Sequence, residues 1–515
     1  MDTGKITYEI IKTGQDLDTI LVRSGGREVP LHSRVNPERD SDLLKDKFDP
    51  SRYDFLVILG VGLGYHCLPL KNLIDRYRRV ILVDILDGIE AAIAANRITS
   101  FLLKDTRITL VAGKTAAEAE RIVAENLDMD DVRGISVLEH PASMRIFGDY
   151  YDSIKKSIDK IIAIKAGNKA TRQAFGIRYL RNVLLNFTMI KKARPVRSLF
   201  NAFAGYPVII AGSGPSLDDG SAMIGRYQDR FFIIAVDSTL PVLEQKGIRP
   251  DIVITIDPQP YAREHFLGCG TDGVLAVYSI SSHPSLVRGL RGFVSFNSHP
   301  FSQLASEVYG GQVGSIDSGT GNVSGDAVSL AVKCGFSSIG ITGLDFSFSR
   351  FAVYARGTAY QKRYGAFFQD RFSTVEGLNM RYIMTSSGGT KHGGIFTRKS
   401  FLHYHHALED YIRDNALSSI IALNGRGIPL AGAVPMDMES YIRLHCPKII
   451  DKKRVLEAID SSAREIDAAP LADALGRIVN NVLFDELLEA SLGGRVDDTV
   501  KNRYRTMARI ASSPG

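Results

Sequence analysis

Short runs of apolar residues recur along the chain at spacings that leave room for a helix between successive runs. The first set lies at Phe55–Leu59, Val80–Val83, Ile108–Val111 and Ile135–Leu138. Strands that alternate with helices build a parallel sheet with helices on its faces. Residues 1–150 are therefore predicted to form an N-terminal Rossmann-like domain, with an irregular lead-in before its first parallel strand.

A second and longer set of apolar runs predicts another α/β domain over residues 200–437. Its expected strands are Val208–Ala211, Phe232–Val236, Ile252–Ile256, Val274–Val277, Ile339–Thr342 and Ile420–Leu423. Residues 151–199 are expected to form a helical linker. Leu471, Leu475, Ile478 and Val482 recur at helical spacing, so residues 438–515 are expected to form a C-terminal helical domain. The predicted fold class is α/β, with two successive Rossmann-like parallel-sheet domains followed by an α-helical region.

Length and composition narrow the class of protein. A chain of 515 residues is too long for one core, and 44% hydrophobic with 23% charged residues is typical of globular proteins. We find no apolar run of about 18 residues and no signal-peptide pattern, so we expect a cytoplasmic protein without a membrane partner. Four widely separated cysteines argue against a zinc site or a disulfide framework, and a net charge of +6 without a basic tail argues against nucleic-acid binding.

A glycine turn follows the first predicted strand, at Gly60, Gly62 and Gly64, and Asp84 ends the next strand. This spacing is typical of dinucleotide or S-adenosylmethionine sites, where an acidic residue binds ribose. The same glycines also occur where a strand packs tightly on its helix. Because the later strand ends of this domain show no catalytic set, we favour a structural turn.

The strongest site signal is the segment Gly212–Ser216, which follows the first strand of the central domain. Two glycines would let backbone amides turn toward an anion, and Pro215 is expected to begin a helix whose positive end faces it. Polar residues then follow the later strands, where open α/β sheets bind ligands. The expected binding residues are Gly212, Ser213, Gly214, Pro215, Ser216, Asp237, Ser238, Gln259, Ser318, Gly319, Asn322, Ser324, Asp345 and Arg356.

At these residues the chain resembles the motility-associated factor (Maf) family of flagellin glycosyltransferases. The shared segments are Gly212–Leu217, Asp237-Ser238, Gly247–Asp251, Asp257–Gln259, Gly321–Ser324 and Gly343–Asp345. The Gly-x-Gly-Pro-Ser-Leu domain of that family is also described as 6-hydroxymethylpterin diphosphokinase-like. The resemblance implies transfer of a sugar to Ser or Thr of flagellin or a related filament protein.

A more distant similarity, to the bacterial sialyltransferases of glycosyltransferase family 42, covers Ser318-Gly319, Gly335–Phe346 and Tyr354-Ala355. That resemblance implies a CMP-activated nonulosonic acid of the sialic, pseudaminic or legionaminic type as donor. It places a set of residues around the CMP portion: Gly214, Pro215, Ser216, Ser318, Gly319 and Tyr354. No metal or other cofactor is expected to be required.

The catalytic residues are less clearly marked, because Maf proteins commonly carry a histidine where this chain has Tyr354. We expect Tyr354 to stabilise the departing phosphate and either Asp257 or His392 to act as the base. His403, His405 and His406 are further candidates for that base. A histidine on a helix face is more often structural.

Two other functions stay open. A pterin pyrophosphokinase needs Mg²⁺ between paired carboxylates, and the segment Thr255–Gln259 supplies one acid where that group has two. A non-catalytic flagellar assembly or chaperone protein that retains the fold is the alternative from a different class.

Overall fold

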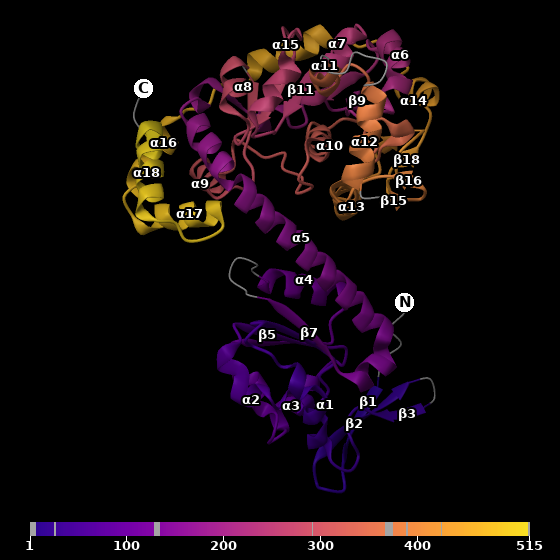
Figure 1. The fold of residues 1–515 in the computed structure, drawn as a ribbon, viewed down its shortest axis with the longest axis vertical. Helices are drawn as coiled ribbons and strands as arrows, with labels where there is room; N and C mark the ends of the chain where they lie inside the picture. Colours follow the sequence, from indigo (N-terminus) through magenta and orange to yellow (C-terminus); the bar gives the residue numbers. More distant parts are fainter. Residues whose placement is uncertain are drawn as a thin grey trace. The chain divides into compact units, whose positions relative to one another are not determined.

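The computed structural model describes residues 7–24, 27–127, 134–290, 292–365, 374–387, 390–423 and 425–512. The chain divides into two compact units, Met1–Ala174 and Phe175–Gly515. Helix α5 (Pro141–Phe187) begins in the first unit and ends in the second (Figure 1). No helix in the described part of the chain is long and apolar enough to cross a membrane.

The first unit contains a parallel sheet in the order β6-β5-β4-β7. Its strands are β4 (Phe55–Leu59), β5 (Arg79–Asp84), β6 (Ile108–Ala112) and β7 (Ile135–Glu139). Its helices are α1 (Asp40–Leu44), α2 (Leu70–Leu73), α3 (Ile89–Ala95) and α4 (Ala116–Asn126), and α5 starts after β7. All four predicted strands are confirmed; the central strands β4 and β5 are almost completely buried, whereas β6 and β7, at the edges of the sheet, are partly exposed.

The lead-in of this unit is more regular than expected. It forms an antiparallel sheet of β1 (Thr7–Lys12), β2 (Asp18–Ser24) and β3 (Arg27–Pro30). β1 has a largely exposed surface with no continuous apolar run, which explains why hydrophobic patterning missed it.

The second unit contains a larger parallel sheet in the order β18-β17-β14-β9-β10-β11-β12-β13-β8 among the described residues. Its strands are β8 (Arg194–Pro195), β9 (Pro207–Ala211), β10 (Phe232–Val236), β11 (Ile252–Thr255), β12 (Leu275–Ser279), β13 (Gly292–Ser295), β14 (Ser338–Thr342), β17 (Ile420–Ala422) and β18 (Val434–Pro435). The six predicted strands are present. β8, β13 and β18 were missed because they have only two to four residues.

Helices cover both faces of this sheet. They are α6 (Leu217–Tyr227), α7 (Leu240–Gln245), α8 (Pro284–Gly289), α9 (Pro300–Val308), α10 (Val323–Lys333), α11 (Ala359–Gly365), α12 (Val375–Ser387), α13 (Lys399–Asp414), α14 (Met438–His445) and α15 (Lys452–Ser462). Alternate residues of β9 enter different cores: Ile210 packs in one with α10, α13 and α15, and Ile209 in another with α6, α7 and α14. This alternation is the two-residue period of a strand buried on both faces.

The C-terminal residues are helical, as predicted. They form α16 (Ala469–Ile478), α17 (Val482–Leu492) and α18 (Asp498–Ser512), which lie together in Figure 1. Leu471, Leu475 and Ile478 share a core with the end of α5 and with β12 and β13. The expected position of Val482 on the same helix face is wrong, because α16 ends at Ile478 and Val482 starts the next helix with 70% of its surface exposed.

Candidate functional site

The site lies at the carboxyl end of the larger sheet, where the strand order reverses. From β9 the chain continues outward through β10, β11 and β12, and later returns to place β14 on the other side of β9. Open α/β sheets bind ligands at such a switch point. The segments that leave β9 and β14, Gly212–Ser216 and Gly343–Asp345, therefore meet at the expected place.

These two segments are joined by hydrogen bonds. The amide of Gly212 donates to the carbonyl of Thr342 at 2.8 Å, and that of Gly214 to the carbonyl of Gly343 at 2.8 Å. The amide of Ser216 donates to Oδ2 of Asp345 at 2.8 Å. Three of the amides that were expected to cradle a phosphate, those of Gly212, Gly214 and Ser216, therefore already donate to acceptors within the protein. Binding of an anion at this segment stays a prediction.

The two glycines are required for a different reason than expected. Neither has a positive φ. A Cβ on Gly212 would lie 2.5 Å from the carbonyl oxygen of Gly343, and one on Gly214 would lie 2.6 Å from Oδ2 of Asp345. Close approach of the neighbouring strand end, rather than of a ligand, excludes a side chain here.

Asp345 is buried at this junction and holds it together. Besides accepting from Ser216, it lies next to Gly343, whose amide donates to Oγ of Ser216 at 3.0 Å. Oδ1 of Asp345 is buried without a hydrogen-bond partner in the described residues. Burial raises the pKa of Asp345 to about 6, so this residue, expected to contact a ligand, stabilises the turn.

Asp237 and Asp257 come from adjacent strand ends, after β10 and β11. Asp237 accepts from the amide of Ser238 at 2.7 Å through Oδ1 and from Oγ1 of Thr255 at 2.7 Å through Oδ2. Oδ1 of Asp257 accepts from the amide of Gln259 at 2.8 Å. Burial, with the nearby charge of Asp237, raises the pKa of Asp257. Two carboxylates that sequence spacing did not pair are thus neighbours in space.

Tyr354, which the resemblance places at the CMP phosphate, is affected by the charges of both acids. Its pKa is raised by burial, lowered by the charge of Arg398, and raised by Tyr382, Asp237 and Asp257. The ring of Tyr354 packs in one cluster with Tyr382 and Phe401. Sequence reasoning missed Arg398 and Tyr382, because they follow no strand and match no motif.

Arg398 precedes α13 and brings a positive charge into this group. One of its terminal nitrogens donates to the hydroxyl of Tyr382 at 2.9 Å, and its guanidinium lies 4.1 Å from the ring centroid of Phe401. Nε of Arg398 is buried without a hydrogen-bond partner, and no carboxylate forms an ion pair with it within the described ranges. An unpaired, partly buried cation is costly unless an anion arrives to meet it.

The loop before α10 is organised by Asp326. Oδ1 of this buried residue accepts from both the amide and Oγ of Ser318, at 2.8 and 2.7 Å, while Asn322 caps α10 by accepting from the amide of Gly325. Burial raises the pKa of Asp326 to about 7. Gly319 is exposed, with a φ of +72° and open space around its Cα. Ser318 and Asn322 thus support the loop, and Gly319 is its accessible residue.

Several other predicted residues occupy distinct places. Ser213 accepts from Oγ of Ser238 at 3.0 Å, between the β9 and β10 ends. Ser324 lies in the first turn of α10, and Arg356 is exposed, with its amide donating to Asp218. His392 is exposed in the hairpin β15 (Lys391–His392) and β16 (Ile395–Phe396), and makes no hydrogen bond with Asp257 or Tyr354 among the described residues.

The remaining histidine candidates lie on α13. His405 is buried, and its Nε2 pairs with the carbonyl of Pro429 at 2.8 Å, which places the proton on that nitrogen. His403 and His406 are exposed. His405 therefore has a structural partner, and the role of a base stays a prediction for Asp257 or His392.

Two tyrosines extend the site beyond the sequence expectations. The pKa of Tyr179, on the last part of α5, is raised by burial and by Asp257, Tyr404 and Asp317. Tyr404 lies 3.8 Å from the position that a Cβ on Gly321 would take. The end of α5, the Ser318 loop and α13 thus approach the Asp257 side of the sheet.

The glycine turn of the first unit is closed by the protein itself. Oδ2 of Asp84 accepts hydrogen bonds from the amides of Val61 and Gly62, both at 2.7 Å, so this oxygen is already occupied by the protein and is not free to bind a ribose hydroxyl. A Cβ on Gly62 would lie 2.5 Å from Nε2 of His32. The favoured interpretation as a structural turn agrees with this packing.

His32, His66 and His140 are buried together beside that turn. The rings of His66 and His140 stack at 4.3 Å with an angle of only 9° between their planes. Metal ligands coordinate through in-plane nitrogen lone pairs, and two parallel stacked rings do not direct them at one ion. Nε2 of His32 also accepts from the amide of Leu63 at 2.9 Å. This cluster therefore packs the turn rather than forming a ready metal site.

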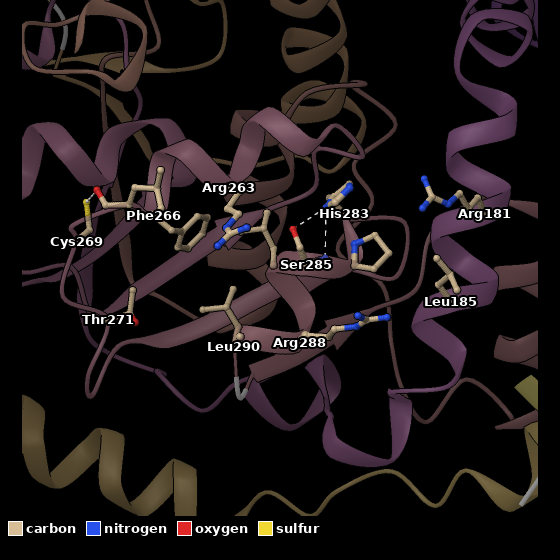
Figure 2. Close-up of a pocket in the computed structure, with 14 residues that line it drawn as sticks. Arg181, Leu185, Arg263, Phe266, Cys269, Thr271, His283, Ser285, Arg288 and Leu290 are labelled. Carbon is tan, nitrogen blue, oxygen red and sulfur yellow. Dashed lines mark hydrogen bonds between the residues drawn. The ribbon is translucent and has the colours of Figure 1, made fainter. Parts of the chain in front are cut away.

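A cavity of about 520 Å³ lies beside the candidate site, between the end of α5 and the segments around β12 (Figure 2). Arg181, Arg263, His283 and Arg288 line it, together with apolar side chains. The amide of His283 donates to the carbonyl of Asp257 at 3.1 Å, so this cavity and the acid pair share a structural element.

Comparisons with known proteins agree with the motif resemblance. A model of the family described as 6-hydroxymethylpterin diphosphokinase MptE-like matches residues 181–351. The solved structure of a Maf glycosyltransferase from Magnetospirillum magneticum AMB-1 superposes with a TM-score of 0.61 and 14% sequence identity, covering 99% of this chain and 90% of that one.

Among curated sequences, two uncharacterized proteins of Treponema pallidum (strain Nichols) are 27% and 29% identical to this chain. The matches extend over 42% and 43% of this chain and over 39% and 48% of those proteins. The chain thus spans less than half the length of these relatives. The matched family model and the solved structure together show that the chain carries an MptE-like domain and has the fold of the Maf glycosyltransferase.

Proposed function

We propose that this chain is a glycosyltransferase that moves a nonulosonic acid from a CMP-activated donor to a Ser or Thr hydroxyl of flagellin or a related filament protein. The observation that carries the proposal is the guanidinium of Arg398, which has no carboxylate partner among the described residues and whose charge acts on Tyr354, as do the charges of Asp237 and Asp257. A cation and an acid close together suit a reaction in which an anion departs and a proton is removed.

Arg398 and Tyr354 replace the backbone amides as the groups that would meet the donor phosphate. The guanidinium donates charge-assisted hydrogen bonds, and the phenol keeps its proton because burial raises its pKa. The hydroxyl of Tyr354 is therefore a donor at neutral pH. Both groups stabilise the negative charge that CMP gains as it leaves.

Asp257 is the acid best suited to accept the proton. The attacking hydroxyl oxygen forms a bond to the anomeric carbon, the bond from that carbon to the phosphate oxygen breaks, and the hydroxyl proton passes to the carboxylate. A raised pKa makes Asp257 a better base than an ordinary carboxylate. Asp237 is less suited, because both of its oxygens already accept hydrogen bonds.

The first test is binding of CMP to the full chain by calorimetry. We expect saturable binding that weakens about tenfold or more in Arg398→Gln, the loss of one charge-assisted contact, and less in Arg398→Lys, which keeps the charge. Equal affinity in Arg398→Gln would contradict the phosphate role.

The second test concerns the reaction. Glycan mass on flagellin would be measured in cells that carry the native chain, Tyr354→Phe, Asp257→Asn or, as an exposed control, His403→Gln. We expect loss of the glycan with Asp257→Asn and retention with His403→Gln. Full glycosylation in both site variants would instead favour a role in filament assembly without catalysis.

A pterin diphosphokinase is the second candidate, and one observation favours it. Asp237 and Asp257 follow adjacent strands and the charge of Asp237 raises the pKa of Asp257, whereas the sequence had indicated a single acid. These carboxylates would hold Mg²⁺, which would neutralise the triphosphate charge of ATP. The test is the unfolding temperature of the chain with each ligand. An increase with ATP and Mg²⁺, and none with CMP, would favour the diphosphokinase over the glycosyltransferase.

A further inference from the structure

The cavity between α5, the 3-10 turn Pro260–Phe266 and α8 contains an excess of positive charge. Arg181 comes from α5, Arg263 from the turn and Arg288 from α8, and His283 lies between them in sequence and in Figure 2. None of the residues that line the cavity is an Asp or a Glu. The charged groups that line it are therefore three guanidinium groups.

These arginines have no partner that neutralises them. Within the described ranges, none of the three side chains forms a hydrogen bond or an ion pair, although arginines elsewhere in this unit, such as Arg426 and Arg505, pair with carboxylates. In Figure 2 the guanidinium of Arg181 extends from α5 toward His283. Unpaired cations that surround a hollow raise the local concentration of anions.

His283 is affected by the same positive charge and supplies a hydrogen-bond donor. Burial and the charge of Arg181 lower its pKa, so the imidazole stays neutral. Nδ1 accepts from the amide of Ser285 at 3.3 Å, which places the proton on Nε2. The neutral ring therefore offers one N–H donor beside the guanidinium of Arg181.

The size and the remaining walls of the cavity indicate the class of ligand. A volume of about 520 Å³ falls in the range of small-molecule sites. Leu185, Phe266, Leu286 and Leu290 supply apolar surface between the charged groups. We propose that this cavity binds a small organic anion with two phosphate or carboxylate groups, held by Arg181, Arg288 and His283 with Arg263 at the other end.

The cavity is positioned to influence the neighbouring reaction. Nδ2 of Asn182, which follows Arg181, donates to the carbonyls of Pro258 and Ser281 at 2.9 and 3.0 Å. Arg181 is thus adjacent to a residue that binds Pro258, the neighbour of Asp257, and the amide of His283 donates to Asp257 itself, so a ligand that orders Arg181 and His283 acts close to Asp257. Binding itself does not depend on the proposed glycosyl transfer.

The experiment uses inorganic pyrophosphate as a compact probe with two phosphate groups. The full chain is titrated by calorimetry at constant ionic strength in the native form and in Arg181→Gln, Arg288→Gln and Arg181→Lys. Arg495→Gln, at an exposed position after α17, is the matched control. We expect the two Gln variants each to weaken binding about tenfold or more, Arg181→Lys to weaken it less, and the control to bind like the native chain.

The same titration is repeated in an Arg398→Gln background, because pyrophosphate is also expected at the proposed CMP site. Pyrophosphate binding that survives Arg398→Gln and disappears on adding Arg288→Gln supports the second site even if CMP does not bind. Binding that is unchanged by Arg181→Gln and Arg288→Gln, or that stays unsaturated at about 1 mM, overturns the proposal. Circular dichroism of each variant separates loss of the site from loss of the fold.

Discussion

Asp326→Asn is expected to stabilise the second unit at high pH, because the native carboxyl is ionised there in a buried place. Only 7% of Asp326 is exposed, and burial raises its pKa from 3.8 to about 7. Oδ1 accepts both hydrogen bonds from Ser318. An asparagine retains this acceptor without the charge, so the loop geometry is preserved.

The size of the effect follows from the two pKa values. The unfolded chain loses the proton near pH 3.8 and the folded chain near pH 7. Between these values the native state binds more protons than the unfolded state, so the free energy of unfolding falls as pH rises and levels off above pH 7. A difference of about 3 units corresponds to about 4 kcal/mol at most.

The assay is chemical denaturation of the native chain and Asp326→Asn between pH 4 and pH 8. Circular dichroism is suitable because the chain contains no tryptophan. We expect the stability of the variant relative to the native chain to increase with pH, while Asp473→Asn, on an exposed helix position, shows no such trend. A relative stability that is independent of pH would refute the reasoning from burial.

Three further substitutions test the packing of the two glycine turns and the C-terminal helices. Gly214→Ala places a Cβ 2.6 Å from Oδ2 of Asp345 and is expected to destabilise the second unit by about 1–3 kcal/mol in denaturant melts. The control is Gly148→Ala, in α5, where a Cβ meets open space; this variant is expected to be neutral or slightly stabilising. Gly62→Ala would place a Cβ 2.5 Å from Nε2 of His32. This variant is expected to lower the unfolding temperature of the first unit while the second unit still binds CMP. An equal fall in the unfolding temperatures of the two units in differential calorimetry would contradict this. Leu475→Ala empties a fully buried position and is expected to cost about 2–5 kcal/mol, and a change below about 1 kcal/mol would show that α16 does not pack as described.

The central strands of both sheets were predictable because they are completely buried. β4, β9 and β10 are continuous apolar runs with every residue buried, and such runs are read from the sequence directly. The edge strands β8 and β18 were not, since two residues carry no pattern. They pair with the sheet through backbone groups, which any residue provides.

The candidate site was only partly predictable. Asp257 and Tyr354 follow recognisable motifs, and the charge of Asp257 acts on Tyr354. Arg398 and Tyr382 come close to Tyr354 from the segment between β14 and β17, far along the chain. No spacing rule links them to Asp257, because only the packing of α12 and α13 brings them there.

The sequence by itself determined two parallel-sheet units, a helical C-terminal region and the polar residues at the strand ends, because hydrophobic period and glycine position are local properties. The tertiary structure decided what those residues contact. Gly212 and Gly214 had indicated an anion cradle, but the carbonyls of Thr342 and Gly343, about 130 residues further on, accept from their amides, and Gly343 and Asp345 fill the space beside them. The unpaired charges at Arg398 and around the cavity also became visible only when distant segments were brought together, since a charge lacks a partner only with respect to its neighbours in space.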